Sequence, residues 1–150
     1  NLYDKPDNKF VAGFIGAPQM NLIEATVAKN GGDVTLAFGG NTIALPADKA
    51  KKLESAGYVG KVVTLGIRPE DLHDEERFLE GSPSSVMEAT IRVYELLGAE
   101  VYLYFDVEDV SFTARVNPRT TARVGDTIKL ALDLTKIHVF DKDTELVILN

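Results

Sequence analysis

Short runs of alternating apolar and polar residues, each closed by a turn residue, fill this chain from residue 21 onward. Such a period of two residues is typical of strands with one buried face, and the paired glycines Gly31-Gly32 and Gly39-Gly40 favour hairpin turns. Strands are predicted at 22–29, 34–38, 42–45, 61–67, 89–94, 101–107, 110–116, 127–132, 137–140 and 145–149. Short strands at this spacing indicate a small closed barrel, and we predict a five-stranded oligomer-binding (OB) barrel, which leaves few open strand edges.

Two helices are predicted beside the strands. Residues 6–15 begin with Pro6, which suits the first helical turn, and the segment ends at Gly16 and Pro18. Residues 47–56, rich in Ala, Lys and Leu, are predicted as a second helix. The predicted fold class is therefore mainly β: an OB-fold-like small β-barrel with short helices and a leading helical segment.

The charge of the chain and the residue types it lacks narrow its function. It has 150 residues, of which 45% are hydrophobic, and a net charge of −7. An acidic chain is a poor partner for nucleic-acid phosphates, and the absence of cysteine excludes disulfides, thiolate metal sites and cysteine nucleophiles. No apolar run reaches the roughly 20 residues that span a bilayer. The chain starts without Met or a signal-peptide pattern, so we expect a piece of a longer protein.

No catalytic motif is recognisable in the sequence. Gly60-Lys61 is followed by Val62 instead of the Ser or Thr of a phosphate-binding loop, and no Gly-x-Ser-x-Gly elbow occurs. His73 stands among carboxylates, which predicts a solvated position. His138 alternates with apolar neighbours, which predicts a position on the surface of a strand. We therefore predict no catalytic residue in this chain.

Two groups of carboxylates are predicted to be solvated instead of binding metal. Asp141, Asp143 and Glu145 lack the turn glycine and the terminal Glu of a calcium loop, so we predict a polar hairpin tip. The segment 69–80 holds six carboxylates and a single arginine, which is typical of a solvated face. No metal site is expected.

Aromatic residues on the predicted strands have two interpretations. They are core or barrel-surface residues, or they are platforms on which single-stranded nucleic acid stacks. The acidic net charge favours the first interpretation. The residues concerned are Tyr94, Tyr102, Tyr104, Phe105 and Phe112.

The segment Arg68-Pro69-Glu70 has a structural interpretation of its own. Pro69 is predicted to end the strand 61–67, because proline lacks an N–H group, and to hold Arg68 in an extended conformation. The guanidinium of Arg68 is then placed to form a bidentate pair with a carboxylate and to fix the turn. We favour this role over ligand binding.

Residues 3–21 (YDKPDNKFVAGFIGAPQMN) and residues 65–72 (LGIRPEDL) together resemble the ATP-binding subunits of ABC-type sugar importers, of the maltose and multiple-sugar type. The resemblance continues at 93–98 and at Phe140-Asp141. It implies that residues 1–20 end an ATPase domain and that residues 21–150 form an OB-fold regulatory (TOBE) domain. Its structural signature falls on Gly66, Arg68, Pro69 and Glu70, and its hinge or junction on Gly16, Pro18, Met20 and Asn21.

The resemblance implies a non-catalytic role in regulation and dimerisation. ATP and Mg²⁺ are bound by the ATPase domain that precedes such a segment, so no cofactor is expected in this chain. The implied partners are a second copy of the subunit, the membrane permease subunits and a regulatory protein. The implied location is the cytoplasmic face of the cell membrane, reached through the transporter complex.

Two other functions stay open on the sequence. One is an OB-fold sensor domain of another ABC importer, of the polyamine or molybdate type, that binds an oxyanion or a sugar. The other is a nucleic-acid-binding barrel, which the acidic charge disfavours.

Overall fold

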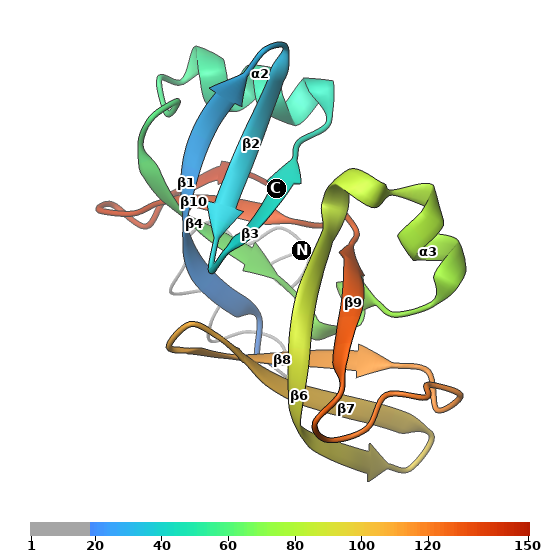
Figure 1. Cartoon of the computed structure of the whole chain (residues 1–150). Coiled ribbons are helices and arrows are strands. Elements are labelled where there is room, and N and C mark those ends of the chain that lie inside the picture. Colours follow the sequence, from blue (N-terminus) through green and yellow to red (C-terminus); the bar gives the residue numbers. More distant parts are fainter. Residues whose placement is uncertain (1–18) are drawn as a thin grey trace.

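The computed structural model describes residues 19–150. Short strands follow one another along the chain, as the alternating pattern predicts, with two short α-helices and two single 3₁₀ turns between them (Figure 1). The predicted helix 6–15, with Gly16 and Pro18, lies outside the described residues. The elements are β1 (Asn21–Asn30), β2 (Asp33–Phe38), β3 (Asn41–Ala44), α2 (Ala47–Ser55), β4 (Val62–Ile67), η1 (Pro69–Asp71), β5 (Leu72–His73), α3 (Glu76–Gly81), η2 (Pro83–Ser85), β6 (Val86–Leu97), β7 (Glu100–Val107), β8 (Val110–Val116), β9 (Thr127–Leu132), β10 (His138–Asp141) and β11 (Val147–Leu149).

The strands form two antiparallel sheets. The six-stranded sheet has the order β11-β10-β4-β1-β2-β3, and the five-stranded sheet has the order β5-β9-β6-β7-β8. In Figure 1 the first sheet and α2 occupy the upper part of the molecule, and β7 and β8 close its lower end. The mainly β fold class is confirmed, with the strands shared between two sheets that pack on each other.

Strand β6 changes its partner along its length. Residues 86–90 pair with β9, and from Ile91 onward the strand pairs with β7. The register with β7 shifts between Ile91 and Val93, so Arg92 is an extra residue opposite β7. A bulge of this kind bends a strand and increases its twist. The second half of β6 is thereby directed away from β9.

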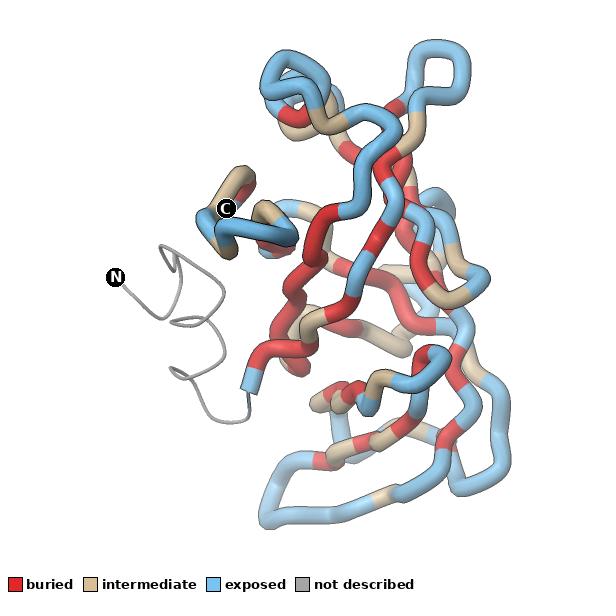
Figure 2. The backbone as a smooth tube through the Cα atoms, turned by 90° about the vertical axis from the view of Figure 1, so that its left-hand side faces the viewer, coloured by how far each residue is buried: buried red, intermediate tan, exposed pale blue. Residues whose placement is uncertain are grey.

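Both sheets contribute to one hydrophobic core. The alternation of buried and exposed residues along the strands is visible in Figure 2, and the buried apolar side chains of the two sheets form a single cluster. Phe105 and Phe112 lie in it with their ring centroids 5.7 Å apart, as the core interpretation of these residues predicts. A second, smaller cluster contains Met20 and Phe140.

The turns of the two sheets also contact each other. Gly39, between β2 and β3, has φ +54°, a conformation that favours glycine. A Cβ atom at this position would lie 2.3 Å from Cγ1 of Val107, at the end of β7. The glycine therefore serves both the hairpin turn and the close approach of the second sheet.

The acidic segment 69–80 is more structured than predicted. Leu72 is fully buried and pairs with Leu132 of β9, while residues 76–81 form α3. Of the carboxylate residues, only Glu76 and Glu80 are exposed, and the other four are half-buried. Leu72 joins the hydrophobic core, whereas α3 contains no buried residue. Among the described residues, no helix is both long enough and apolar enough to cross a bilayer.

Candidate functional site at the junction of the two sheets

Gly66 of β4 makes room for the smaller hydrophobic cluster. A Cβ atom on Gly66 would lie 2.6 Å from Sδ of Met20 and 3.2 Å from Cε2 of Phe140. Both side chains are buried, and they occupy the space that the missing side chain leaves. The structure thus brings one predicted signature residue, Gly66, against one predicted junction residue, Met20.

Asn21 connects the first strand of one sheet to the edge strand of the other. Its side-chain Nδ2 donates to the carbonyl oxygen of Thr113 at 2.9 Å, and the N–H of Thr113 donates back to Oδ1 of Asn21, also at 2.9 Å. The amide group therefore pairs with the edge of β8 as a strand residue would. Asn21 is buried, so these two hydrogen bonds are shielded from water.

Arg68 follows the last residue of β4 and is buried. It is extended (φ −78°, ψ 151°) and precedes Pro69, which starts η1, so both predictions about Pro69 are confirmed. Nη1 of Arg68 lies 2.9 Å from Nε2 of His138. A guanidinium only donates, so Nε2 must accept and the imidazole carries its proton on Nδ1. That nitrogen lies 3.4 Å from Oδ1 of Asn150.

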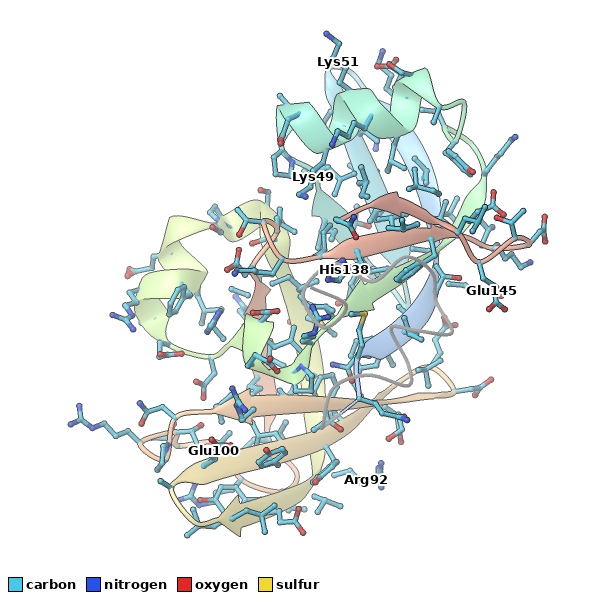
Figure 3. The ribbon with its side chains drawn as sticks, turned by 180° about the vertical axis from the view of Figure 1, so that it is seen from behind. Lys49, Lys51, Arg92, Glu100, His138 and Glu145 are labelled. Carbon is cyan, nitrogen blue, oxygen red and sulfur yellow. The ribbon has the colours of Figure 1, made fainter. Side chains whose placement is uncertain are left out.

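The prediction that His138 lies on a strand surface is wrong, because its exposed fraction is only 2%. Figure 3 shows the side chain in the middle of the molecule, where the six-stranded sheet approaches the lower strands. Strand β10 lies between β4 and β11 and is buried on both faces. The alternation of polar and apolar residues along it therefore does not indicate which side chains are exposed. The sequence predicted a carboxylate partner for Arg68, and the structure shows that the guanidinium donates to this imidazole.

Asp71 lies next to this buried pair and has an unusual titration. Its N–H donates to the carbonyl oxygen of Arg68, and its own carbonyl accepts from the N–H of Asp133, both at 3.0 Å. Burial, together with the negative charges of Glu70 and Asp133, raises the pKa of Asp71 to about 6, against the smaller opposing effects of Lys136 and Arg68. Sequence analysis missed this residue, because Asp133 is brought beside it only by the fold.

His73 and Asp74, which follow, are also less exposed than predicted. The ring of His73 stacks on Phe78 at a centroid distance of 4.1 Å, and the side chain is half-buried. The hydroxyl of Thr120 donates to Oδ2 of Asp74 at 2.5 Å. The prediction of a solvated His73 is therefore wrong, because α3 folds back over it.

The predicted polar tip between β10 and β11 is confirmed. Oδ1 of Asp141 accepts the N–H groups of Asp143 at 2.9 Å and Thr144 at 2.8 Å. The hydroxyl of Tyr58 donates to Oδ2 at 2.6 Å. These hydrogen bonds, with the one from the Thr144 backbone foremost, lower the pKa of Asp141 to about 2. Residues 19–150 contain no group of three or more His, Asp or Glu side chains placed to hold a metal ion.

The hairpin of β6 and β7 contrasts with this buried junction. We call residues 93–104, where Val93 pairs with Tyr104 and Leu97 with Glu100, the distal arm. Its end lies at the bottom of Figure 2 and is drawn almost entirely as exposed. Tyr104 is only half-buried, and its hydroxyl donates to Oε1 of Glu95 at 2.8 Å. Sequence analysis named Tyr94, Tyr102 and Tyr104 of this hairpin as core or barrel-surface residues, and residues 93–98 as part of the family resemblance, but it did not predict that Leu96 and Leu97 are exposed.

The fold and the junction define a class of protein. Residues 65–140 match the TOBE domain and residues 16–72 match the MalK OB fold domain, and the two matches overlap on residues 65–72, which contain Gly66 and Arg68. This chain belongs to the TOBE domain family.

Its relatives are ATP-binding subunits of importers. The chain is 39% identical to the oligosaccharides import ATP-binding protein MsmX of Bacillus subtilis, over 97% of this chain and 39% of MsmX. It is 41% identical to the multiple sugar-binding transport ATP-binding protein MsmK of Streptococcus mutans, over 98% of this chain and 38% of MsmK. It is 38% identical to the trehalose/maltose import ATP-binding protein MalK of Thermococcus litoralis, over 95% of this chain and 38% of MalK. The chain thus spans about two fifths of the length of these relatives.

A solved structure shares the fold. The cytoplasmic molybdate-binding protein ModG superposes with a TM-score of 0.57 at 17% identity, over 83% of this chain and 96% of ModG. At this identity the likeness establishes the fold alone.

Proposed function

We propose that this chain is the C-terminal, non-catalytic domain of the ATP-binding subunit of a carbohydrate ABC importer. The observation that carries the proposal is that the MalK OB fold and TOBE matches together cover residues 16–140. The identity to three importer ATP-binding proteins, over nearly all of this chain but about two fifths of theirs, supports it further. Residues 1–20 are then the end of the ATPase domain, and residues 21–150 are the regulatory domain.

The proposed role of the domain is mechanical. Pairing between two such domains keeps two ATPase subunits at a high effective concentration while the subunits separate and rejoin. The buried contacts of Met20 and Asn21 support this role, because Met20 packs against Gly66 and Phe140 of the six-stranded sheet and Asn21 hydrogen-bonds to β8 of the other sheet. We propose permease subunits and a regulatory protein as further partners. The domain then acts at the cytoplasmic face of the membrane, through the complex.

The test compares ATP hydrolysis with self-association. The purified chain of residues 1–150 is expected to show no ATPase activity above a buffer blank and to associate weakly at high concentration. Sedimentation velocity over a concentration series measures the association. An ATPase rate intrinsic to the chain would contradict the proposal, and so would saturable binding of molybdate or maltose in calorimetry, since that result identifies a ligand sensor.

A further inference from the structure

The two sheets border an open cleft between the start of β1 and the hairpin of β7 and β8. Its volume is about 400 Å³, and its lining includes Leu22, Glu24 and Thr64 on one side and residues 107–110 on the other. Figure 1 shows the lower end of β1 beside β8, and the side chain of Asn21 hydrogen-bonds to β8 there. The walls of the cleft therefore come from different sheets.

Three exposed carboxylates line the cleft. Glu24 belongs to β1, whereas Glu108 and Asp109 form the turn between β7 and β8, so the negative charges come from both walls. Lys142 lies 3.9 Å from Glu24. Within residues 19–150, neither Glu108 nor Asp109 forms an ion pair or a side-chain hydrogen bond. The protein's own side chains thus leave most of this negative charge unpaired.

The same cleft also has an apolar lining. Leu22 and Val110 are half-buried and Val107 is buried, and all three side chains belong to residues that line the cleft. Hydrocarbon that lies against them is removed from water, which favours binding in proportion to the apolar area covered. A ligand for this cleft therefore carries both positive charge and hydrocarbon.

The hydroxyl group of Thr64 is an independent sign of a ligand. Thr64 lines the cleft and is only 4% exposed. Its side chain forms no hydrogen bond within residues 19–150. A buried hydroxyl group without a partner costs free energy, and an N–H donor in the cleft would remove that cost. Exposed carboxylates alone would be satisfied by water, whereas this buried oxygen lacks a partner.

The charges and the lining together select the class of ligand. An anion is repelled by three carboxylates. A metal ion does not fit, because residues 19–150 contain no group of three His, Asp or Glu side chains placed to hold one. Carboxylates on two walls with apolar side chains in the same cleft suit a molecule that has ammonium groups at both ends of a methylene chain.

We propose that this cleft binds a linear diamine or polyamine, with ammonium groups at Glu24 and at the turn between β7 and β8, and with an N–H group donated to Thr64. The inference does not rest on the proposed function, because the ligand is a cation and is neither an imported sugar nor an oxyanion. The bound molecule connects β1 of one sheet to the β7–β8 hairpin of the other. It is therefore expected to raise the thermal midpoint of the chain as its concentration increases.

Calorimetry on the chain of residues 1–150 tests the class of ligand. Spermidine and cadaverine are expected to bind one molecule per chain with a dissociation constant on the order of 0.1–1 mM, because exposed ion pairs are weak. The single amine n-butylamine and the ion Mg²⁺ are expected to bind about tenfold more weakly. If n-butylamine binds as tightly as cadaverine, the cleft accepts one ammonium group, as on a lysine side chain, and the proposal is contradicted. Equal binding of Mg²⁺ would contradict it as well, since diffuse charge then suffices.

Matched variants test the location of the site. Glu24→Gln is expected to raise the dissociation constant of spermidine about threefold or more. Glu88→Gln removes the same charge from an exposed position of β6 and is expected to change it by less than about twofold. Thr64→Val removes the hydroxyl and is expected to weaken spermidine binding about fivefold. The thermal midpoint of the ligand-free Thr64→Val variant should be equal to or higher than that of the unmodified chain, because no protein hydrogen bond is lost.

Three results would overturn the site. Equal effects of Glu24→Gln and Glu88→Gln would assign spermidine to the negative surface in general. A lower thermal midpoint of ligand-free Thr64→Val, or unchanged spermidine binding by this variant, would show that the hydroxyl serves the fold and not a ligand. The absence of saturable binding by every amine would exclude the cleft as a polyamine site. The proposed function would stand in each case, because ATP hydrolysis and self-association test it separately.

Discussion

The junction and the distal arm are built from opposite kinds of residue, and in each region the surroundings are unusual for that kind. At the junction, Asn21, Arg68 and His138 are polar, yet all three are buried and hydrogen-bonded. In the arm, Leu96 and Leu97 are apolar, yet more than half of each side chain is exposed. Buried polar groups without partners cost free energy, and exposed leucines gain free energy when they are covered.

This difference separates a region that connects the strands from a region that the fold leaves exposed. The residues predicted as signature and junction residues include Gly66, Met20 and Asn21, whose contacts connect β4 with β10 and β1 with β8. Exposed apolar side chains are found in the arm. We therefore expect substitutions at the junction to lower stability, and substitutions in the arm to leave the fold intact.

The largest loss of stability is expected for Arg68→Ala. The substitution removes the Arg68 hydrogen bond to the buried Nε2 of His138 and leaves space at a buried position. We expect the free energy of unfolding to fall by about 3 kcal/mol, measured by urea denaturation. The control is Arg115→Ala, which removes an ion pair with Glu100 at the half-exposed surface of the arm and is expected to cost less than about 1 kcal/mol. Equal losses of unfolding free energy in the two variants would show that the buried contacts of the junction stabilise the fold no more than a surface ion pair does.

Asn21→Ala is expected to cost about 2 kcal/mol, because it removes both hydrogen bonds to the edge of β8. Hydrogen exchange at the Thr113 amide should accelerate at the same time. Asn117→Ala removes a single side-chain hydrogen bond to the Arg119 amide in an exposed loop, so it should cost less than about 0.5 kcal/mol. A Thr113 amide that stays protected in Asn21→Ala would contradict the proposed link between the sheets.

Asp71→Asn sharpens the comparison through pH. The folded state raises the pKa of this carboxyl to about 6, so it binds the proton more tightly than the unfolded chain does. Stability from this group is therefore present below pH 4 and is lost as the pH rises to about 6. We expect Asp71→Asn to match the unmodified chain at pH 3.5 and to be more stable at pH 7 by about 1 kcal/mol, with solvent screening taken into account. If Asp71→Asn and the unmodified chain differed in unfolding free energy by the same amount at both pH values, the raised pKa of Asp71 would be refuted.

The smallest effect is expected for Tyr58→Phe, which removes the hydroxyl that donates to Asp141 at the exposed tip of β10 and β11. Here the folded state lowers the pKa of the carboxyl to about 2, so the stabilisation is present above pH 4 and is lost as the pH falls toward 2. The thermal midpoint at pH 7 should fall by less than in Asn21→Ala. A larger fall would show that this tip, and not the junction, carries the greater share of stability.

Much of the fold could be predicted from the sequence. Alternation predicted the strands to within a few residues, and the paired glycines marked the hairpins that flank β2. Pro69 was correctly predicted to end β4, because a missing N–H group acts on the nearest backbone alone. The recognisable signature of residues 65–72 predicted the family, which the TOBE and OB fold matches confirm.

The environment of single side chains was decided by the tertiary structure. His138 is buried because β4 and β11 flank β10. The pKa of Asp71 is raised to about 6 because burial and the negative charges of Glu70 and Asp133 disfavour its ionised form. The distal arm has an open edge because β9 pairs only with residues 86–90 of β6. Local periodicity determines which residues lie on one face of a strand. Which strand then covers that face depends on contacts between segments far apart in the chain, and those contacts set burial, titration and accessible edges.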